Sequence, residues 1–443
     1  MNLLKKNFYS FIYFIAKFFF ILLILVSVFR FKKKIIKKFK NKYFSVPTVN
    51  TYGDIIDHLE LTRLLEIDKK KDFIFISAKE FPNNYFPKIF LKKEKVFFYK
   101  ESLYIFFLRI IKKIPSKYGY LVRNFNHLLQ QYLIKYLASF KFYEDCKDFK
   151  LNKKISTKGF TQEFINSYLA KIHLGKSFST TKLWELKKKY GSLNLINLKD
   201  VYDERYKNFL FKKLGIKKKF VCLHIRTSWS DKPNKFEPRD VSINNLESFN
   251  SSLIFLIKNG YEVVLMGLEN KQLKNYFNFK GVIDYRNSGY QNLKNDLYLY
   301  GLCDFFMGQV SGPFVLAMHL DRPILLMDVV SIDDIPCVDK ILFYPKKVYQ
   351  KKRKQLTIRE FINLPLYYGD DFVDQNLQFL EDMSERERLA CVKEFLVKIS
   401  SNNFSFKSKH HKNLKSMLHP TFHKNFLLTY NKISKDFLMN YYK

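Results

Sequence analysis

Short apolar runs alternate with stretches of helical periodicity in the second half of the chain. The stretch SINNLESFNSSLIFLIKNG (242–260) places its apolar residues on one helical face, between Ser242 as N-cap and Gly260 as C-terminal stop. Strands that are apolar throughout and alternate with helices are typical of a parallel sheet covered on both faces. A Rossmann-like α/β domain is therefore predicted for 206–400. Its strands are predicted at 219–225, 261–267, 281–285, 304–308 and 322–328.

The first half carries the same kinds of pattern less regularly. The stretch DIIDHLELTRLLEID (54–68) has the apolar stripe of a helix, and the runs DFIFISA (72–78) and KVFFYK (95–100) predict strands. We therefore expect another domain over 47–205 and a helical C-terminal tail over 401–443.

The N-terminus carries a long apolar run, FIYFIAKFFFILLILVSVF (11–29), close to the ~20 residues that span a bilayer. It predicts a membrane helix over 8–31, followed by a basic juxtamembrane segment over 32–46. The positive-inside rule then keeps the body of the protein in the cytoplasm, on the inner membrane. A cleaved signal peptide and a peripheral helix lying on anionic headgroups are alternatives.

Composition narrows the function classes. The 443 residues are 47% hydrophobic, which indicates a folded chain, and carry a formal net charge of +37. This surplus suits an anionic membrane surface or phosphorylated ligands. A nucleic-acid partner is not expected, because no recognition motif is present. The odd number of scattered cysteines argues against disulfides or a zinc site. They are Cys146, Cys222, Cys303, Cys337 and Cys391.

The candidate chemistry lies where the predicted parallel strands end, because ligands of open α/β sheets bind beyond the carboxyl ends of the strands. The turn GQVSG (308–312) leads into a helix, whose amino end offers unpaired N–H groups to an anion. Arg226 follows the first strand, and together the two features predict a diphosphate clamp. The full set of candidate donor-binding residues is His224, Arg226, Gly267, Asp284, Ser288, Gly308, Ser311 and Gly312.

Each residue also has a purely structural interpretation. Arg226 could pair with Asp231 or Asp240, the GQVSG turn could be an ordinary turn with a serine cap, and His224 could be a core histidine. A Ser-His-Asp triad is rejected, because GQVSG is not a nucleophile elbow. The sequence contains no Asp-x-Asp pair, which favours a site that uses protein cations in place of a divalent metal.

The segments of 218–330 resemble a bacterial glycosyltransferase family defined by sequence. The resemblance rests on LHIRTS, PRDVSI, GYEVVLMG, DYRNS, NDLYLYGLCDFFMGQVSG and DRPILLMD, with weaker similarity in LTIREFINLP (356–365) and YGDIIDHLELTRLLE (52–66). It implies an α/β protein of GT-B architecture, with two Rossmann-like domains and a cleft between them. The first domain would bind the acceptor and the second the donor nucleotide. The chain differs from the family pattern at Leu265, Val310 and Asp328.

The His-x-Arg element also resembles that of fucosyltransferases that use GDP-sugars. This resemblance implies that Arg226 holds the donor diphosphate, with His224 beside it. It further implies that Ser311 and Gly312 form the phosphate-facing turn, and that Asp284 lies near the nucleoside.

These observations lead to one functional hypothesis and its rivals. The hypothesis is a membrane-associated, metal-independent glycosyltransferase of the hexosyltransferase type. It would move a sugar from a nucleotide-diphosphate donor, GDP-linked by the resemblance, to a hydroxyl of a cell-envelope glycan or its lipid-linked precursor. Arg226 and Asp240, as base, would be catalytic, and no cofactor beyond the donor is expected. The rivals are pyruvyl or phosphoglycerol transfer on the same scaffold, and a non-catalytic membrane-anchored binding protein.

Overall fold

The computed structural model divides into two compact units, residues 1–179 and 180–443. In unit 1 it describes 43–45, 73–78, 96–99 and scattered positions within 56–70. In unit 2 it describes positions within 186–196, then 202–226, 245–267, 277, 279–329, 335, 338–350, 355–357, 377–404, 408–417 and 432–441.

The predicted membrane helix over 8–31 lies outside the described residues, as does most of the basic segment over 32–46. Among the residues that are described, no helix is long and apolar enough to cross a membrane.

The described part of unit 1 holds a small parallel sheet. Its strands β1 (Tyr43–Ser45), β2 (Phe73–Ala78) and β3 (Val96–Tyr99) lie in sequence order. The two strands predicted in this half are confirmed as β2 and β3. Ile56, Leu59 and Leu64 are helical and fully buried, as the apolar stripe predicts.

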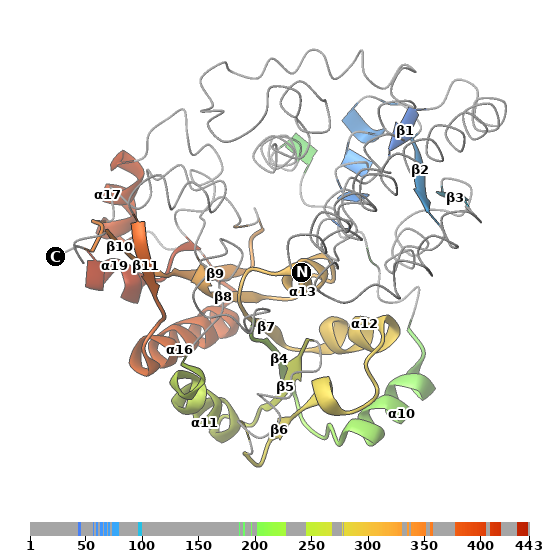
Figure 1. The fold of residues 1–443 in the computed structure, drawn as a ribbon, viewed down its shortest axis with the longest axis horizontal. Coiled ribbons are helices and arrows are strands. Elements are labelled where there is room, and N and C mark those ends of the chain that lie inside the picture. The colour runs from blue at the N-terminus through green and yellow to red at the C-terminus, as the bar shows by residue number, and fades with distance from the viewer. Residues whose placement is uncertain are drawn as a thin grey trace, which may run out of the picture. The chain divides into compact units, whose positions relative to one another are not determined.

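Unit 2 is built on a six-stranded parallel sheet with the order β6-β5-β4-β7-β8-β9 (Figure 1). All five predicted strands are confirmed, and a sixth strand, β9, was not predicted. The burial of nearly every strand residue explains why the runs are apolar throughout. The strands are β4 (Phe220–His224), β5 (Glu262–Met266), β6 (Val282–Ile283), β7 (Phe305–Gly308), β8 (Ile324–Val329) and β9 (Ile341–Pro345).

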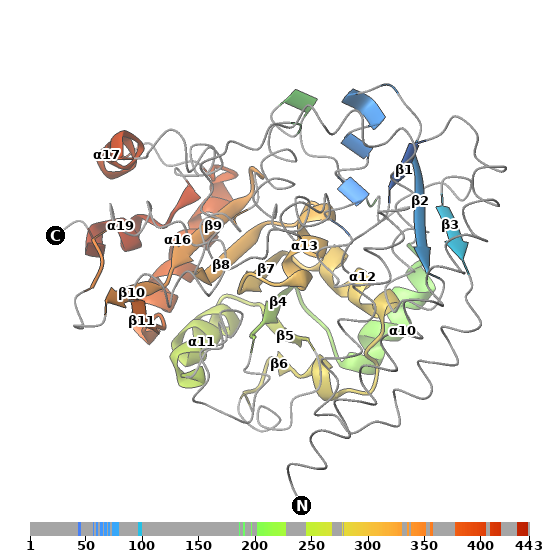
Figure 2. The ribbon, with the colours of Figure 1, turned by 45° about the horizontal axis from the view of Figure 1, so that its top comes forward.

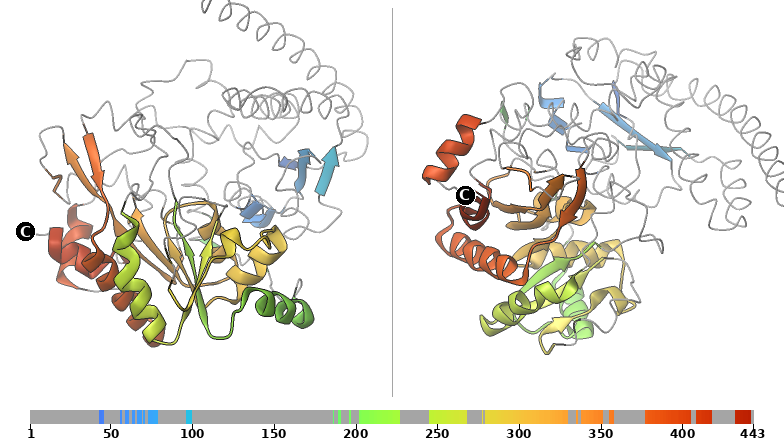
Figure 3. Two further views of the ribbon diagram at one scale, coloured as in Figure 1. Left: turned by 60° about the horizontal axis from the view of Figure 1, so that its bottom comes forward. Right: turned by 60° about the vertical axis from the view of Figure 1, so that its left-hand side comes forward.

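Helices cover both faces of this sheet (Figure 3). On one face α11 (Asn250–Lys258) packs on β5 and on α16 (Glu385–Ser401), which also contacts β8. On the other face α13 (Gly312–His319) packs on β7, β8 and α12 (Leu293–Leu302). Tyr206 of α10 (Glu204–Leu214) donates a hydrogen bond to Asn295 of α12. The predicted α/β class is therefore correct.

The helix predicted over 242–260 begins differently from the prediction. Ser242 lies outside the described residues. Asn245 instead caps a short 3-10 helix, η4 (Leu246–Phe249), through a hydrogen bond from the Ser248 amide, and α11 follows directly.

The C-terminal segment packs into the same unit (Figure 2). Strands β10 (Lys347–Gln350) and β11 (Leu377–Glu381) form an antiparallel pair, and α17 (Lys409–Met417) and α19 (Lys435–Tyr441) follow. The Ser434 amide donates to the Phe343 carbonyl on β9, and Phe437 is fully buried. The last residues thus complete the core beside β9.

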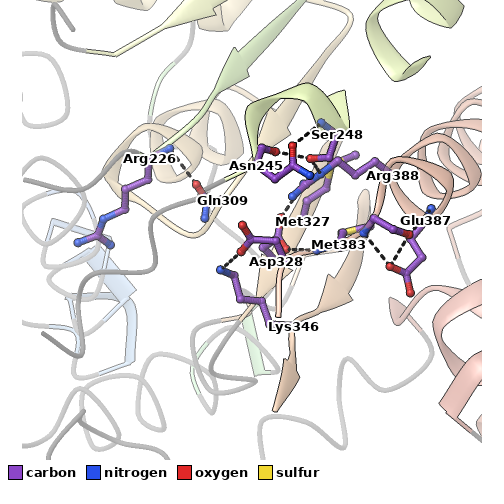
Figure 4. A network of polar contacts seen from close by, with 12 residues as sticks. Arg226, Asn245, Ser248, Gln309, Met327, Asp328, Lys346, Met383, Glu387 and Arg388 are labelled. Carbon is purple, nitrogen blue, oxygen red and sulfur yellow. Dashed lines mark hydrogen bonds and ion pairs between the residues drawn. The ribbon is translucent and has the colours of Figure 1, made fainter. Parts of the chain in front are cut away.

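A buried ion pair joins α16 to the carboxyl end of β8 (Figure 4). Nη1 of Arg388 lies 2.6 Å from Oδ2 of Asp328, and both side chains are fully buried. Oδ1 of Asp328 accepts from the Met383 amide at 2.8 Å, while Nε of Arg388 donates to Oγ of Ser248, also at 2.8 Å. One guanidinium and one carboxylate thus tie together β8, the start of α16 and η4.

Breaking this pair should cost much of the stability of unit 2. We expect Asp328→Asn to lose about 3 kcal/mol of unfolding free energy, because Arg388 is left buried with an uncompensated charge. The double variant with Arg388→Met should recover most of the loss. Asp321→Asn is a matched control. Asp321 shares the left-handed backbone (φ 56° against 54°), but its pair with Lys340 is exposed. Urea unfolding that gives equal losses for Asp328→Asn and Asp321→Asn would contradict the expectation.

Candidate functional site

Six of the eight predicted donor-binding residues lie near the point where the sheet changes its direction of winding, whereas Asp284 and Ser288 lie in the turn after β6. Strands β5 and β6 follow β4 on one side, and β7, β8 and β9 continue on the other, so β4 and β7 are neighbours at the switch point. In open α/β sheets, ligands bind beyond the strand ends at this point. His224 and Gly308 are register partners at the ends of these two strands.

The two strand ends approach each other very closely. A Cβ atom on Gly308 would lie 2.3 Å from the carbonyl oxygen of His224, a distance that no side chain can tolerate. On the other side of β4, a Cβ on Gly267 would lie 3.2 Å from Cδ2 of His224, and Gly267 has a φ of 117°. Glycine at both positions lets the neighbouring backbones close around His224.

The turn after β7 is hydrogen-bonded to the residues that leave β4. The Gln309 amide donates to the His224 carbonyl at 3.4 Å, and Oε1 of Gln309 accepts from the Arg226 amide at 2.8 Å. Oγ of Ser311 lies 3.2 Å from Nδ1 of His224 and donates to the Gln309 carbonyl at 3.2 Å.

Arg226 and the start of α13 therefore lie at the same sheet edge, on adjacent strands. Ser311 is the N-cap of α13, yet its side chain makes no capping hydrogen bond to the helix. Gly312 begins the helix and Pro313 follows it. The amino end of α13 is thus not capped by its own serine. Pro313 has no N–H, so the Gly312 amide and the partial positive charge of the helix end are the groups that an anion would meet.

His224 is electrically neutral at physiological pH. Burial, together with the smaller effect of the positive charges of Arg226 and Arg286, lowers its pKa to about 4. Both guanidinium groups act on this ring, and that of Arg286 is itself paired with Asp284. Arg286 was not singled out from the sequence. It lies in the turn after β6, and only the tertiary structure shows that its charge reaches His224.

Asp284 and Ser288 both lie in the turn after β6, where their side chains have partners within the turn. Asp284 pairs with Arg286 at 3.1 Å and accepts from Asn287 at 2.6 Å. The Ser288 hydroxyl donates to the Tyr285 carbonyl at 2.8 Å. Gln291 donates to the carbonyls of Gly267 and Arg286, so this turn is attached to the end of β5. The donor-binding roles of Asp284 and Ser288 stay predictions.

Asp240, the predicted base, lies outside the described residues. Within the described part of the chain, no group of three or more His, Cys, Asp or Glu residues is placed to hold a metal ion. The cysteines in that part, Cys222, Cys303 and Cys391, are buried free thiols.

Comparisons with known proteins give no family assignment. No protein-family profile and no curated protein matches the sequence. Among solved structures, E. coli ADP-heptose LPS heptosyltransferase II is 11% identical, with a TM-score of 0.41, over 81% of this chain and 99% of that chain. A family 9 glycosyl transferase from Veillonella parvula is 13% identical, with a TM-score of 0.33, over 64% of this chain and 80% of that one.

A UDP-GlcNAc 2-epimerase from Neisseria meningitidis, bound to UDP-GlcNAc, is 11% identical, with a TM-score of 0.33, over 65% of this chain and 82% of that chain. Similarities at this level carry no argument about activity, which must come from the site itself.

Adding a methyl group at Gly308 should open the junction between β4 and β7. We expect Gly308→Ala to lose about 3 kcal/mol of unfolding free energy, because the backbones must separate. Gly289→Ala is the control. Gly289 has a φ of 75° but no atom within 4 Å of its would-be Cβ, so it should lose only about 1 kcal/mol from backbone strain. Equal losses of unfolding free energy in Gly308→Ala and Gly289→Ala, measured by urea unfolding, would show that the close approach of β4 and β7 does not require glycine at 308.

The depressed pKa of His224 predicts a pH dependence of stability. The unfolded chain binds a proton at His224 near pH 6.5, and the folded chain only near pH 4. Stability from the neutral ring is therefore present above pH 6.5 and lost as the pH falls toward 4, by up to about 3 kcal/mol. His224→Asn should reduce this loss, measured as urea unfolding free energies at pH 7 and 4.5. An identical loss of unfolding free energy in the wild type and in His224→Asn would refute the assignment of this pH dependence to His224.

Proposed function

We propose that this protein is a glycosyltransferase of GT-B architecture. It would transfer a sugar from a nucleotide-diphosphate donor to a hydroxyl of a cell-envelope glycan or its lipid-linked precursor. The observation that carries the proposal is the placement of Arg226 and the start of α13 at one sheet edge, held together by Gln309 and Ser311.

The chemical need that this arrangement meets is countercharge for a departing diphosphate. As the bond from the sugar to the donor breaks, negative charge develops on the β-phosphate oxygens. In the proposal, the guanidinium of Arg226 and the amide groups at the start of α13 bind those oxygens. Since these groups are held by the fold before the donor arrives, they need little reorganisation during the reaction.

The surroundings of the clamp suit a dense anion. Gly312, at the first turn of α13, has no side chain to keep a phosphate from the backbone. His224 stays neutral and so does not add a proton that would titrate with the ligand. The acceptor hydroxyl needs a base, and Asp240 is the proposed residue. The lack of an Asp-x-Asp pair in the sequence supports a mechanism in which protein cations take the place of a metal ion.

The location of the reaction is part of the proposal. The apolar run over 11–29 and the basic residues after it support attachment to the cytoplasmic face of the inner membrane, with the catalytic body in the cytoplasm. An acceptor in the envelope pathway would be within reach of a tethered enzyme.

Arg226→Ala should slow sugar transfer about a hundredfold or more, because each fixed donor aimed at developing charge is worth about 3 kcal/mol of barrier. The assay uses the full-length protein with GDP-, UDP- and ADP-sugars and follows release of the nucleoside diphosphate. CMP-sugars, which carry one phosphate, serve as comparison donors. Arg205→Ala, an exposed arginine of α10, is the matched control and should retain wild-type turnover.

Several outcomes would count against the proposal. Wild-type turnover in Arg226→Ala would reject the clamp. Absence of any stabilisation or turnover with nucleotides would favour a non-catalytic binding protein, or a transferase whose donor lacks a nucleoside.

A further inference from the structure

The position of Arg226 is not set by the sheet itself. The strand β4 ends at His224, two residues earlier, so Arg226 lies where the chain has already left the ladder of strand hydrogen bonds. A residue that must present its charge at one defined place therefore needs another anchor. The proposed function depends on that anchor, because a displaced guanidinium would miss the diphosphate.

The anchor is the side chain of Gln309. Its Oε1 accepts a hydrogen bond from the Arg226 amide at 2.8 Å, and the residue is only 1% exposed. Its own amide donates to the His224 carbonyl. Gln309 thus forms hydrogen bonds with both His224, the last residue of β4, and Arg226, two residues further on. In Figure 4 the guanidinium of Arg226 extends away from this hydrogen bond and away from the Asp328–Arg388 pair.

We infer that Gln309 is a positioning residue that fixes the backbone of Arg226 relative to the start of α13. This inference rests on the proposed function. Gln309 belongs to the same turn as Ser311, so the residue that holds Arg226 is continuous in sequence with the helix end that would hold the other side of the diphosphate. One turn thereby sets the distance between the two halves of the clamp.

The chemistry of glutamine suits this role. Its neutral oxygen reaches the Arg226 amide without adding charge. A carboxylate at the same place would offer the acceptor but would add a negative charge near the proposed phosphate site and repel phosphate. A methionine would retain the volume and lose the acceptor, and would leave the Arg226 amide without this hydrogen bond.

The first test is independent of any ligand. In the full-length protein, hydrogen exchange read at the Arg226 amide should be about tenfold faster in Gln309→Met, because the amide loses its acceptor. Gln309→Glu keeps the oxygen and should exchange nearly as slowly as the wild type. Unchanged exchange in Gln309→Met would overturn the inference, whatever the protein binds.

The second test is a double-mutant cycle on diphosphate binding, with GDP, UDP and inorganic pyrophosphate as calorimetric probes. Gln309→Met should weaken binding about tenfold in the wild-type background, but less than about twofold in an Arg226→Met background, because it acts through Arg226. Equal weakening in both backgrounds would mean that Gln309 has an independent role and would overturn the inference. If the wild type binds none of the probes, the proposed function fails, and so does the role of Gln309 in positioning Arg226 for a diphosphate. The exchange experiment still shows whether Gln309 accepts the hydrogen bond from the Arg226 amide.

Discussion

The close contact between the ends of β4 and β7 is the constraint on which the candidate site depends. Only a glycine at 308 lets the backbone of β7 approach the carbonyl oxygen of His224. Because the strands meet there, the next residues of each strand come within hydrogen-bonding distance of each other. Gln309 reaches Arg226, and Ser311 reaches His224. The packing of the β4 and β7 backbones therefore sets the position of Arg226 relative to the start of α13.

Electrostatics at this edge agree with the geometry. Burial keeps His224 neutral, and the charges of Arg226 and Arg286 act in the same direction. An anion bound at the strand ends would be attracted by the charge of Arg226. At the end of β8, the buried Asp328–Arg388 ion pair neutralises two charges and joins α16 to the sheet. The fold therefore neutralises the charge of Arg388, which is structural. Arg226 is half-buried at the strand ends, where the proposed ligand would bind.

The sequence predicts the strands of the sheet better than the contacts between residues that are far apart in the chain. Continuous apolar runs identified five strands of unit 2, and the rule of strand ends then gave the edge on which Arg226 and Ser311 lie. Strand β9 was missed. Its neighbours include Ile433 and Ser434, which are about ninety residues away and which no local pattern connects to it. The bond from Arg226 to Gln309 was likewise out of reach, because it depends on the exact register of β4 and β7.

An experimental structure of the full-length protein with bound UDP or GDP would show directly whether the two groups bind one diphosphate. We expect the β-phosphate to contact both the Arg226 guanidinium and the backbone amide of Gly312, with β4 and β7 in contact at Gly308. A diphosphate bound elsewhere, or one that touches neither group while Arg226 pairs with a carboxylate, would contradict this expectation.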